Sequence, residues 1–154
     1  MAFLSSMSIV GSGLTAQQLR LDIVSENIAN INTTRTEDGG GAYRRKVVVF
    51  EAQDGRDSFR LALARSRDRL EPNTGYNTAG GVQVTNILED TSDMKLVYDP
   101  THPDANEQGY VELPNVELVK EITDAMAATQ AYSANVTAFN TLKAVAAKAL
   151  EIGR

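Results

Sequence analysis

The only histidine of the chain, His102, lies between two carboxylates in the segment Asp99-Pro100-Thr101-His102-Pro103-Asp104. An imidazole beside carboxylates could act as a general base or bind a metal ion. However, each proline fixes its own backbone and restricts the residue before it, so the segment predicts a rigid turn in which these side chains converge poorly. The chain has no cysteine to assist. A hydrolase that uses His102 is therefore the weakest of the functions considered.

Two other clusters could contact phosphate, but neither has the full pattern for it. Gly39-Gly40-Gly41 lacks both the Gly-Lys-Ser/Thr ending of a phosphate-binding loop and the spacing of a dinucleotide fingerprint. Arg44-Arg45-Lys46 has only Tyr43 as an aromatic neighbour, and the net charge of −5 argues against general nucleic-acid binding. We expect no active site, no cofactor, no bound metal and no nucleic-acid partner.

The strongest periodicity lies at the two ends of the chain. Mostly apolar residues recur at alternating steps of four and three from Phe3 to Ile31 and from Leu118 to Leu150. This repeat predicts two helices, each with a stripe suited to packing on another helix. An amphipathic helix usually packs on its own domain. A stripe of roughly 30 residues, about 45 Å as a helix, is too long for the short middle of the chain to cover. Most of each stripe should therefore face the other helix or another copy.

The middle of the chain predicts short strands separated by turns. β-branched residues or apolar–polar alternation mark four candidate strands, and an extended segment then leads into Asn115, a residue that favours helix N-caps. The candidate strands are Tyr43–Phe50, Phe59–Ala64, Val82–Leu88 and Met94–Tyr98.

These elements predict an α+β fold. We expect long N- and C-terminal helices, paired as an antiparallel coiled coil, with a small β-rich segment inserted between them. The expected division is residues 1–34 for the N-terminal helix, 35–114 for the β-rich segment and 115–154 for the C-terminal helix.

Composition limits where such a chain can reside. No run approaches the roughly 18 to 20 apolar residues of a membrane span. The first residues, Met1 to Ser6, have no basic residue before their apolar stretch and do not resemble a cleavable signal peptide.

Charge is distributed unevenly along the chain. Arg44 to Arg69 contains eight basic and four acidic residues, whereas Leu70 to Asp124 contains eleven acidic and two basic residues. Both regions could simply be solvated surface. Alternatively, copies of the chain could meet basic face to acidic face, which would set their orientation.

Several segments resemble one known family. Ser12-Gly13-Leu14-Thr15-Ala16-Gln17, followed by Glu26-Asn27-Ile28-Ala29-Asn30-Ile31-Asn32-Thr33-Thr34, resembles the N-terminal signature of the bacterial flagellar rod, hook and filament-junction family. Further segments are similar to the proximal rod members of that family, namely Val97–Ala105, Gly109-Tyr110-Val111, Pro114-Asn115-Val116 and Ala149–Arg154. The resemblance covers the whole chain in order.

The resemblance implies a structural subunit of the flagellar proximal rod, not an enzyme. The terminal helices would pair in the inner wall of a tube that carries motor torque across the periplasm. The implied partners are further copies of the chain, other proximal and distal rod proteins, the adaptor that joins the rod to the export gate, and the flagellar type III export apparatus. That apparatus would export the chain without signal cleavage. The alternative is a secreted, adhesin-like coiled-coil module.

The expected assembly residues lie on the two stripes and at the exit of the first helix. Asn27 and Asn30 could cap the helix or bond to a neighbouring backbone. The residues expected to pack between subunits are Leu14, Gln17, Leu21, Val24, Asn27, Ile28, Asn30, Ile31, Leu118, Ile122, Tyr132, Val136, Phe139 and Leu150.

Overall fold

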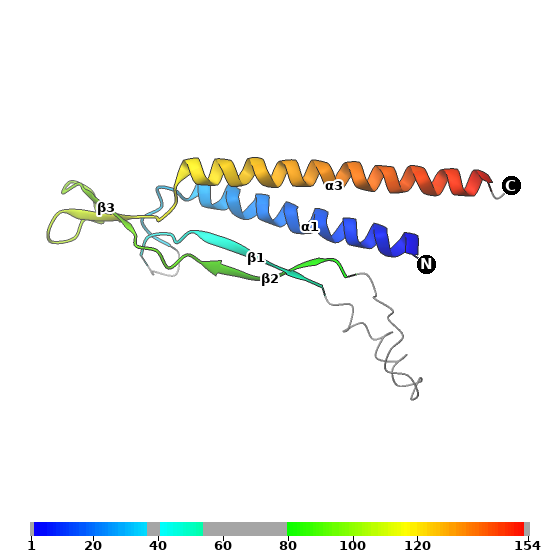
Figure 1. Cartoon of the computed structure of the whole chain (residues 1–154). Helices are drawn as coiled ribbons and strands as arrows, with labels where there is room; N and C mark the ends of the chain where they lie inside the picture. The colour runs from blue at the N-terminus through cyan, green and yellow to red at the C-terminus, as the bar shows by residue number, and fades with distance from the viewer. Residues whose placement is uncertain (1, 37–40, 54–79, 153–154) are drawn as a thin grey trace, which may run out of the picture. The chain divides into compact units, whose positions relative to one another are not determined.

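The structure is a computed structural model that describes residues 2–36, 41–53 and 80–152, with side chains from Leu4 to Glu151. The expected strand at 59–64 lies outside the described residues. Helices at both ends, with short strands between them, confirm the α+β class (Figure 1). The elements are α1 (Ala2–Ala29), β1 (Lys46–Ala52), β2 (Val82–Glu89), β3 (Lys95–Tyr98), β4 (Tyr110–Leu113) and α3 (Leu118–Ile152).

The described chain forms two compact units, and each contains part of both helices. Unit 1 comprises the described residues of Met1–Gln17, Phe50–Thr85 and Ala131–Arg154. Unit 2 comprises those of Gln18–Val49 and Asn86–Gln130. The expected division at residues 34/35 and 114/115 remains a prediction.

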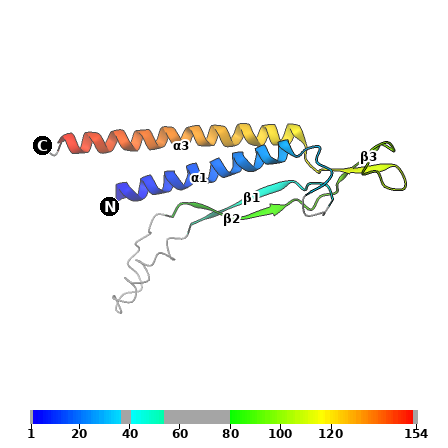
Figure 2. The ribbon, with the colours of Figure 1, turned by 180° about the vertical axis from the view of Figure 1, so that it is seen from behind.

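In unit 2, the C-terminal part of α1 lies beside the N-terminal part of α3 in both views (Figures 1 and 2). Arg20 contacts Asp124, with 3.1 Å between Nη2 and Oδ1, and the Asn27 Nδ2 donates to the Glu121 Oε2, also at 3.1 Å. Because the residue number on α3 falls as that on α1 rises, these parts of the helices run antiparallel.

In unit 1, α1 passes through Gly11-Ser12-Gly13 without interruption, as expected, although each glycine costs about 1 kcal/mol relative to alanine. A Cβ placed on Gly13 would lie 3.1 Å from the Asn135 Nδ2 of α3. The glycine therefore accommodates a close approach of the two helices at this point.

The inward face of α3 in unit 2 is made of small and charged residues. Glu121 and Ala128 are fully buried, whereas Leu118 and Ile122 are each 46% exposed. The expected stripe therefore includes residues that remain substantially exposed beside the buried face of α3. The sequence pattern emphasised large apolar side chains, but a close helix approach favours alanine and tolerates a glutamate whose charge is paired.

Two strand pairs are present among the described residues. β1 pairs with β2, and β3 pairs with β4. At the start of β2, the Val82 N–H donates to the Ser12 Oγ at 3.0 Å, and a Cβ on Gly81 would lie only 2.2 Å from that oxygen. Glycine at position 81 thus lets β2 begin directly against α1 within unit 1.

The antiparallel β3–β4 hairpin places Lys95 opposite Leu113 and Tyr98 opposite Tyr110. The turn expected at 99–104 is confirmed, since the Thr101 N–H donates to the Asp99 Oδ1 at 3.1 Å. Within unit 2, the hairpin extends beyond the adjoining ends of α1 and α3 in both views (Figures 1 and 2).

The N-cap expected at Asn115 is wrong. α3 begins at Leu118, and its first helical bond runs from the Glu121 N–H to the Glu117 carbonyl at 3.0 Å. The Asn115 side chain instead accepts the Arg45 N–H at 2.8 Å and donates to the Asp90 carbonyl at 3.0 Å. Long-range hydrogen bonds have displaced the local capping preference.

Candidate functional site

His102 serves the turn in which it lies. Its Nδ1 accepts the Asp104 N–H at 3.1 Å. Asp104 in turn accepts the Thr34 hydroxyl at 2.8 Å and pairs with Arg35. The Thr34 hydrogen bond, with Arg35 and His102, holds the pKa of Asp104 below its usual value. These contacts tie the exit of α1 to the turn before β4.

The densest set of polar contacts in unit 2 is centred on Asn27, which is only 1% exposed. Its Nδ2 donates to the Lys46 carbonyl at 2.9 Å and to the Glu121 carboxylate at 3.1 Å. Its Oδ1 accepts the Tyr43 hydroxyl and the Lys46 N–H, both at 2.9 Å. Asn27 therefore uses its full hydrogen-bonding capacity within its own chain.

Arg45 supplies the charge at the centre of the same set. Its Nε donates to the fully buried Glu121 carboxylate at 2.6 Å, and its Nη2 donates to the Asp124 Oδ2 at 3.2 Å. A third carboxylate, that of Asp90, lies 3.7 Å from its Nη1. A buried charge is expensive unless it is paired, and these carboxylates satisfy that condition.

Tyr43 completes the cluster as a permanent donor. Burial first, and then the charges of Glu26, Glu121 and Glu89, raise the pKa of Tyr43 to about 12. Its hydroxyl therefore remains protonated near neutral pH and continues to donate to Asn27.

We call this cluster the polar lock. It connects α1, the segment before β1 and the start of α3, and so fixes the register of these elements within unit 2. β1 begins at Lys46, not at the expected Tyr43, because the preceding residues are drawn into these contacts. The polar lock consists of Asn27, Tyr43, Arg45, Asn115, Glu121 and Asp124.

Sequence reasoning placed Asn27 at a packing surface but missed Arg45 and Glu121. The sequence did contain one local sign that Glu121 is buried. It lies on the same helix face as the small residues Ala125 and Ala128, which suit close packing on another helix. No comparable signal marks Arg45 among its basic neighbours. Only the fold brings it against Glu121, which lies 76 positions away in the chain.

Asn30 ends the first helix. Its Nδ2 donates to the Glu26 carbonyl at 3.0 Å, and its Oδ1 accepts the Thr33 hydroxyl at 3.1 Å. Both asparagines of the N-terminal signature thus make hydrogen bonds inside the chain. Their contact with a neighbouring subunit remains a prediction.

The other expected assembly residues differ widely in exposure. Val24 is buried at 5% exposure, and the exposed ones include Val136 at 36% and Leu150 at 77%, besides Leu118 and Ile122. The half-buried residues are Leu14, Gln17, Leu21, Ile28, Asn30, Ile31, Tyr132 and Phe139.

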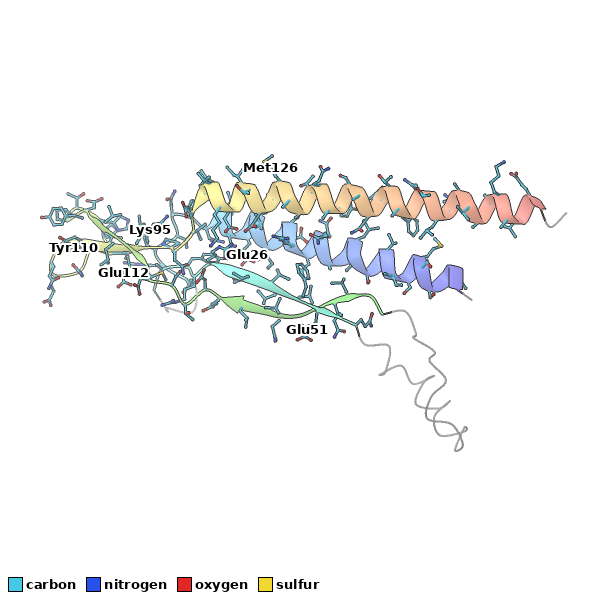
Figure 3. All side chains as sticks on the ribbon, in the orientation of Figure 1. Glu26, Glu51, Lys95, Tyr110, Glu112 and Met126 are labelled. Atoms are coloured by element: carbon cyan, nitrogen blue, oxygen red, sulfur yellow. The ribbon has the colours of Figure 1, made fainter. Side chains whose placement is uncertain are left out.

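A continuous group of exposed apolar residues lies on α3 in unit 2. We call Leu118, Val119, Ile122 and Met126 the outer α3 row. Val119 and Met126, at 72% and 69% exposure, are the two that the heptad pattern missed. Met126 points away from α1 (Figure 3). Exposed apolar patches of this kind commonly mark interaction surfaces.

Comparison with known proteins matches both ends of the chain to families of flagellar basal-body rod proteins. Residues 7–35 match the family described as flagella basal body rod protein, and residues 107–152 match the flagellar basal body rod FlgEFG protein C-terminal family. None of the described helices has the length and apolar character needed to cross a membrane.

Full-length relatives narrow this class. The flagellar basal-body rod protein FlgC of Bacillus subtilis is 45% identical over 152 residues, 97% of each chain. The FlgC proteins of Borreliella burgdorferi and Escherichia coli O157:H7 are 42% and 36% identical, the latter over the full length of both chains. This chain belongs to the FlgC family of flagellar basal-body rod proteins. It is a structural rod subunit and not an enzyme.

Proposed function

We propose that this chain assembles with copies of itself and with other proximal and distal rod proteins into the axial drive shaft of the flagellum. In this arrangement α1 and α3 pair as an antiparallel coiled coil in the wall of the shaft, and the β elements contact neighbouring subunits. Helix packing along the axis supplies the stiffness that transmits motor torque.

The outer α3 row is the observation that supports this proposal most directly. Fully burying a large apolar side chain contributes about 1.5 to 3 kcal/mol, so a neighbouring helix placed over this row would be held firmly. The polar lock orients α3 within unit 2, and it therefore determines the direction in which the row faces.

The same proposal includes the route and the neighbours of the subunit. The chain would be exported through the flagellar type III apparatus without signal cleavage and would reach the rod where it crosses the periplasm. An adaptor between the rod and the export gate would be a further partner. Family membership supports the basal-body location, and an adhesin-like module is not favoured.

Ile122→Asp tests the assembly surface. The substitution places a charge where burial without a partner costs several kcal/mol, so we expect a deletion strain carrying it to lack rods and not to swim. Thr123→Asp is the matched control, because it adds the same charge at an exposed neighbour outside the outer α3 row. We expect that strain to swim.

Leu21→Asp and Ile28→Asp test the half-buried stripe of α1 in the same assay, with loss of rods expected for both. Electron microscopy of basal bodies and soft-agar motility provide the readout. Circular dichroism of the purified variants should show that the helices persist. Normal swimming of the Ile122→Asp strain would show that the outer α3 row is not an assembly surface.

A further inference from the structure

The β3–β4 hairpin has one strongly exposed face. The register places Leu96 opposite Glu112 and Tyr98 opposite Tyr110, and side chains two apart share a face. Leu96 is 62% exposed, Tyr98 65% and Tyr110 41%; on the opposite face Val97 is 43% exposed and Val111 is buried at 3%. We call Leu96, Tyr98, Tyr110 and Glu112 the hairpin face; Figure 3 shows Tyr110 and Glu112 on the hairpin.

The chemistry of the hairpin face favours a cationic and apolar partner. The two tyrosine rings meet edge to face with centroids 5.3 Å apart, which leaves ring surface available for stacking. The Glu112 side chain makes no hydrogen bond or ion pair with any described residue, although its backbone belongs to the β3–β4 ladder. A guanidinium group can stack on a tyrosine ring and pair with a carboxylate, which an ammonium group does less well.

The charge of the surrounding segment also favours a basic partner. No lysine or arginine occurs from Leu96 to Val119, whereas five carboxylates do. Asp104 is already paired with Arg35, but Glu107 and Glu112 are exposed and make no ion pair within the described part of the chain. Such a surface attracts a basic segment and repels an acidic one.

The chain itself contains a segment with the complementary pattern. Residues 59–69 read Phe-Arg-Leu-Ala-Leu-Ala-Arg-Ser-Arg-Asp-Arg, so arginines are interleaved with apolar residues. Among the described cations, Arg45 and Lys46 are already paired with Glu121 and Glu26, and the Lys95 Nζ of β3 donates to the Val116 carbonyl at 2.7 Å. We propose that the hairpin face of one copy binds residues 59–69 of a second copy. This inference depends on the proposed assembly in one respect only, namely that assembly brings two copies of the chain close together.

Binding of a labelled peptide of residues 59–69 to the purified full chain, followed by fluorescence anisotropy, tests the recognition. Glu112→Gln should weaken binding roughly two- to fivefold, the range of an exposed ion pair, and high salt should weaken it further. Glu107→Gln is the matched control, because it removes the same charge outside the hairpin face; we expect no change. A peptide with lysine at every arginine should bind more weakly, because the planar stacking group is lost.

The assay needs no assembled rod, so its failure is distinct from a failure of the assembly proposal. Lack of peptide binding by the unaltered chain, or equal loss in Glu107→Gln and Glu112→Gln, would overturn the inference.

Introduced cysteines distinguish a second copy from the same chain, because the chain has no cysteine of its own. Equal amounts of Glu112→Cys and Ser66→Cys chains should form a mixed disulfide dimer under mild oxidation. Glu107→Cys mixed with Ser66→Cys should form clearly less. A double Glu112→Cys/Ser66→Cys chain that closes only on itself, without dimers, would show that the partner is the chain's own segment and would overturn the proposal.

Discussion

Units 1 and 2 each contain part of α1 and part of α3, but they satisfy their polar groups in different ways. In unit 2, the buried Asn27, Arg45 and Glu121 all have hydrogen-bonding partners within the chain. In unit 1, the Gln17 Oε1 and the Thr85 Oγ1 are buried without a hydrogen-bonding partner among the described residues. An unsatisfied buried polar atom costs about 1 to 3 kcal/mol.

The difference between the units predicts which of them is ordered before the subunit assembles. Hydrogen bonds and ion pairs act only at defined distances, so the polar lock holds unit 2 in one arrangement without help from a neighbour. Unit 1 has the Ser12–Val82 hydrogen bond and a close helix approach at Gly13, and two of its buried polar atoms have no hydrogen-bonding partner among the described residues. We therefore expect unit 2 to be ordered in the free subunit and unit 1 to gain most of its order on assembly.

Among the variants that test the difference between the two units, Glu121→Ala should have the largest effect on stability. It removes the carboxylate that is closest to the buried Arg45 guanidinium, so the free energy of unfolding should fall by about 3 kcal/mol. Urea unfolding followed by circular dichroism measures the change. Glu107→Ala, at an exposed and unpaired glutamate, should change it by less than about 0.5 kcal/mol. Equal effects of the two substitutions would show that the polar lock does not stabilise unit 2.

Hydrogen exchange on the free subunit compares the units directly. Amides of α1 and α3 inside unit 2 should exchange at least about 30-fold more slowly than amides near the start of α1 and the end of α3 in unit 1. This ratio corresponds to a difference of about 2 kcal/mol in opening free energy. Mass spectrometry of peptides from residues 18–28 and 4–12 gives the comparison. Equal protection in both peptides would contradict the division into a complete and an incomplete unit.

Two glycines of α1 sharpen the description of unit 1. Nothing lies within 4 Å of a Cβ added to Gly11, so Gly11→Ala should raise the stability of the helix by up to about 1 kcal/mol. Gly13→Ala should gain less, because its Cβ would lie 3.1 Å from the Asn135 Nδ2. Thermal unfolding of both variants measures the gain, and a double Gly13→Ala/Asn135→Ala variant should recover part of the difference. Equal gains in stability from the two single variants would show that the helices do not approach closely at Gly13.

The smallest effect concerns acid stability in unit 2. Because the folded-state pKa of Asp104 is lowered, its contribution is present above the unfolded value of about 3.9 and is lost as the pH falls through the folded value. The urea midpoint should be flat from pH 7 to 5 and fall below about pH 4. Asp104→Asn should reduce that fall, whereas Asp93→Asn at an exposed aspartate should not. The same slope in both variants would assign the acid sensitivity to other carboxylates.

Much of the fold could be predicted from local patterns. The steps of four and three between Phe3 and Ile31 predicted α1, and the candidate strands Val82–Leu88 and Met94–Tyr98 predicted β2 and β3 nearly to their ends. The prolines around His102 predicted a turn, and the structure adds that the imidazole accepts a hydrogen bond within it. These predictions succeeded because helix periodicity, strand alternation and proline stereochemistry depend on residues close together in the chain.

The candidate site was harder to predict, for reasons visible in particular residues. Asn115 has a local preference for capping, but its side chain satisfies the Arg45 N–H and the Asp90 carbonyl instead. Leu118 and Ile122 belong to a convincing apolar stripe, but they lie beside the face that α3 turns towards α1. In both cases contacts with distant segments outweighed a preference of the local sequence.

The sequence by itself determined that both ends of the chain are helical, that the fold is α+β, and which family the chain belongs to. Each of these depends on short-range spacing and on motifs that can be read residue by residue. Only the tertiary structure decided which face of α3 is buried and which charges form the polar lock. Glu121 can be buried because Arg45, 76 positions away in the chain, is brought within 2.6 Å of its carboxylate. The energy of a buried charge depends on its neighbours in space, and a one-dimensional pattern does not contain that information.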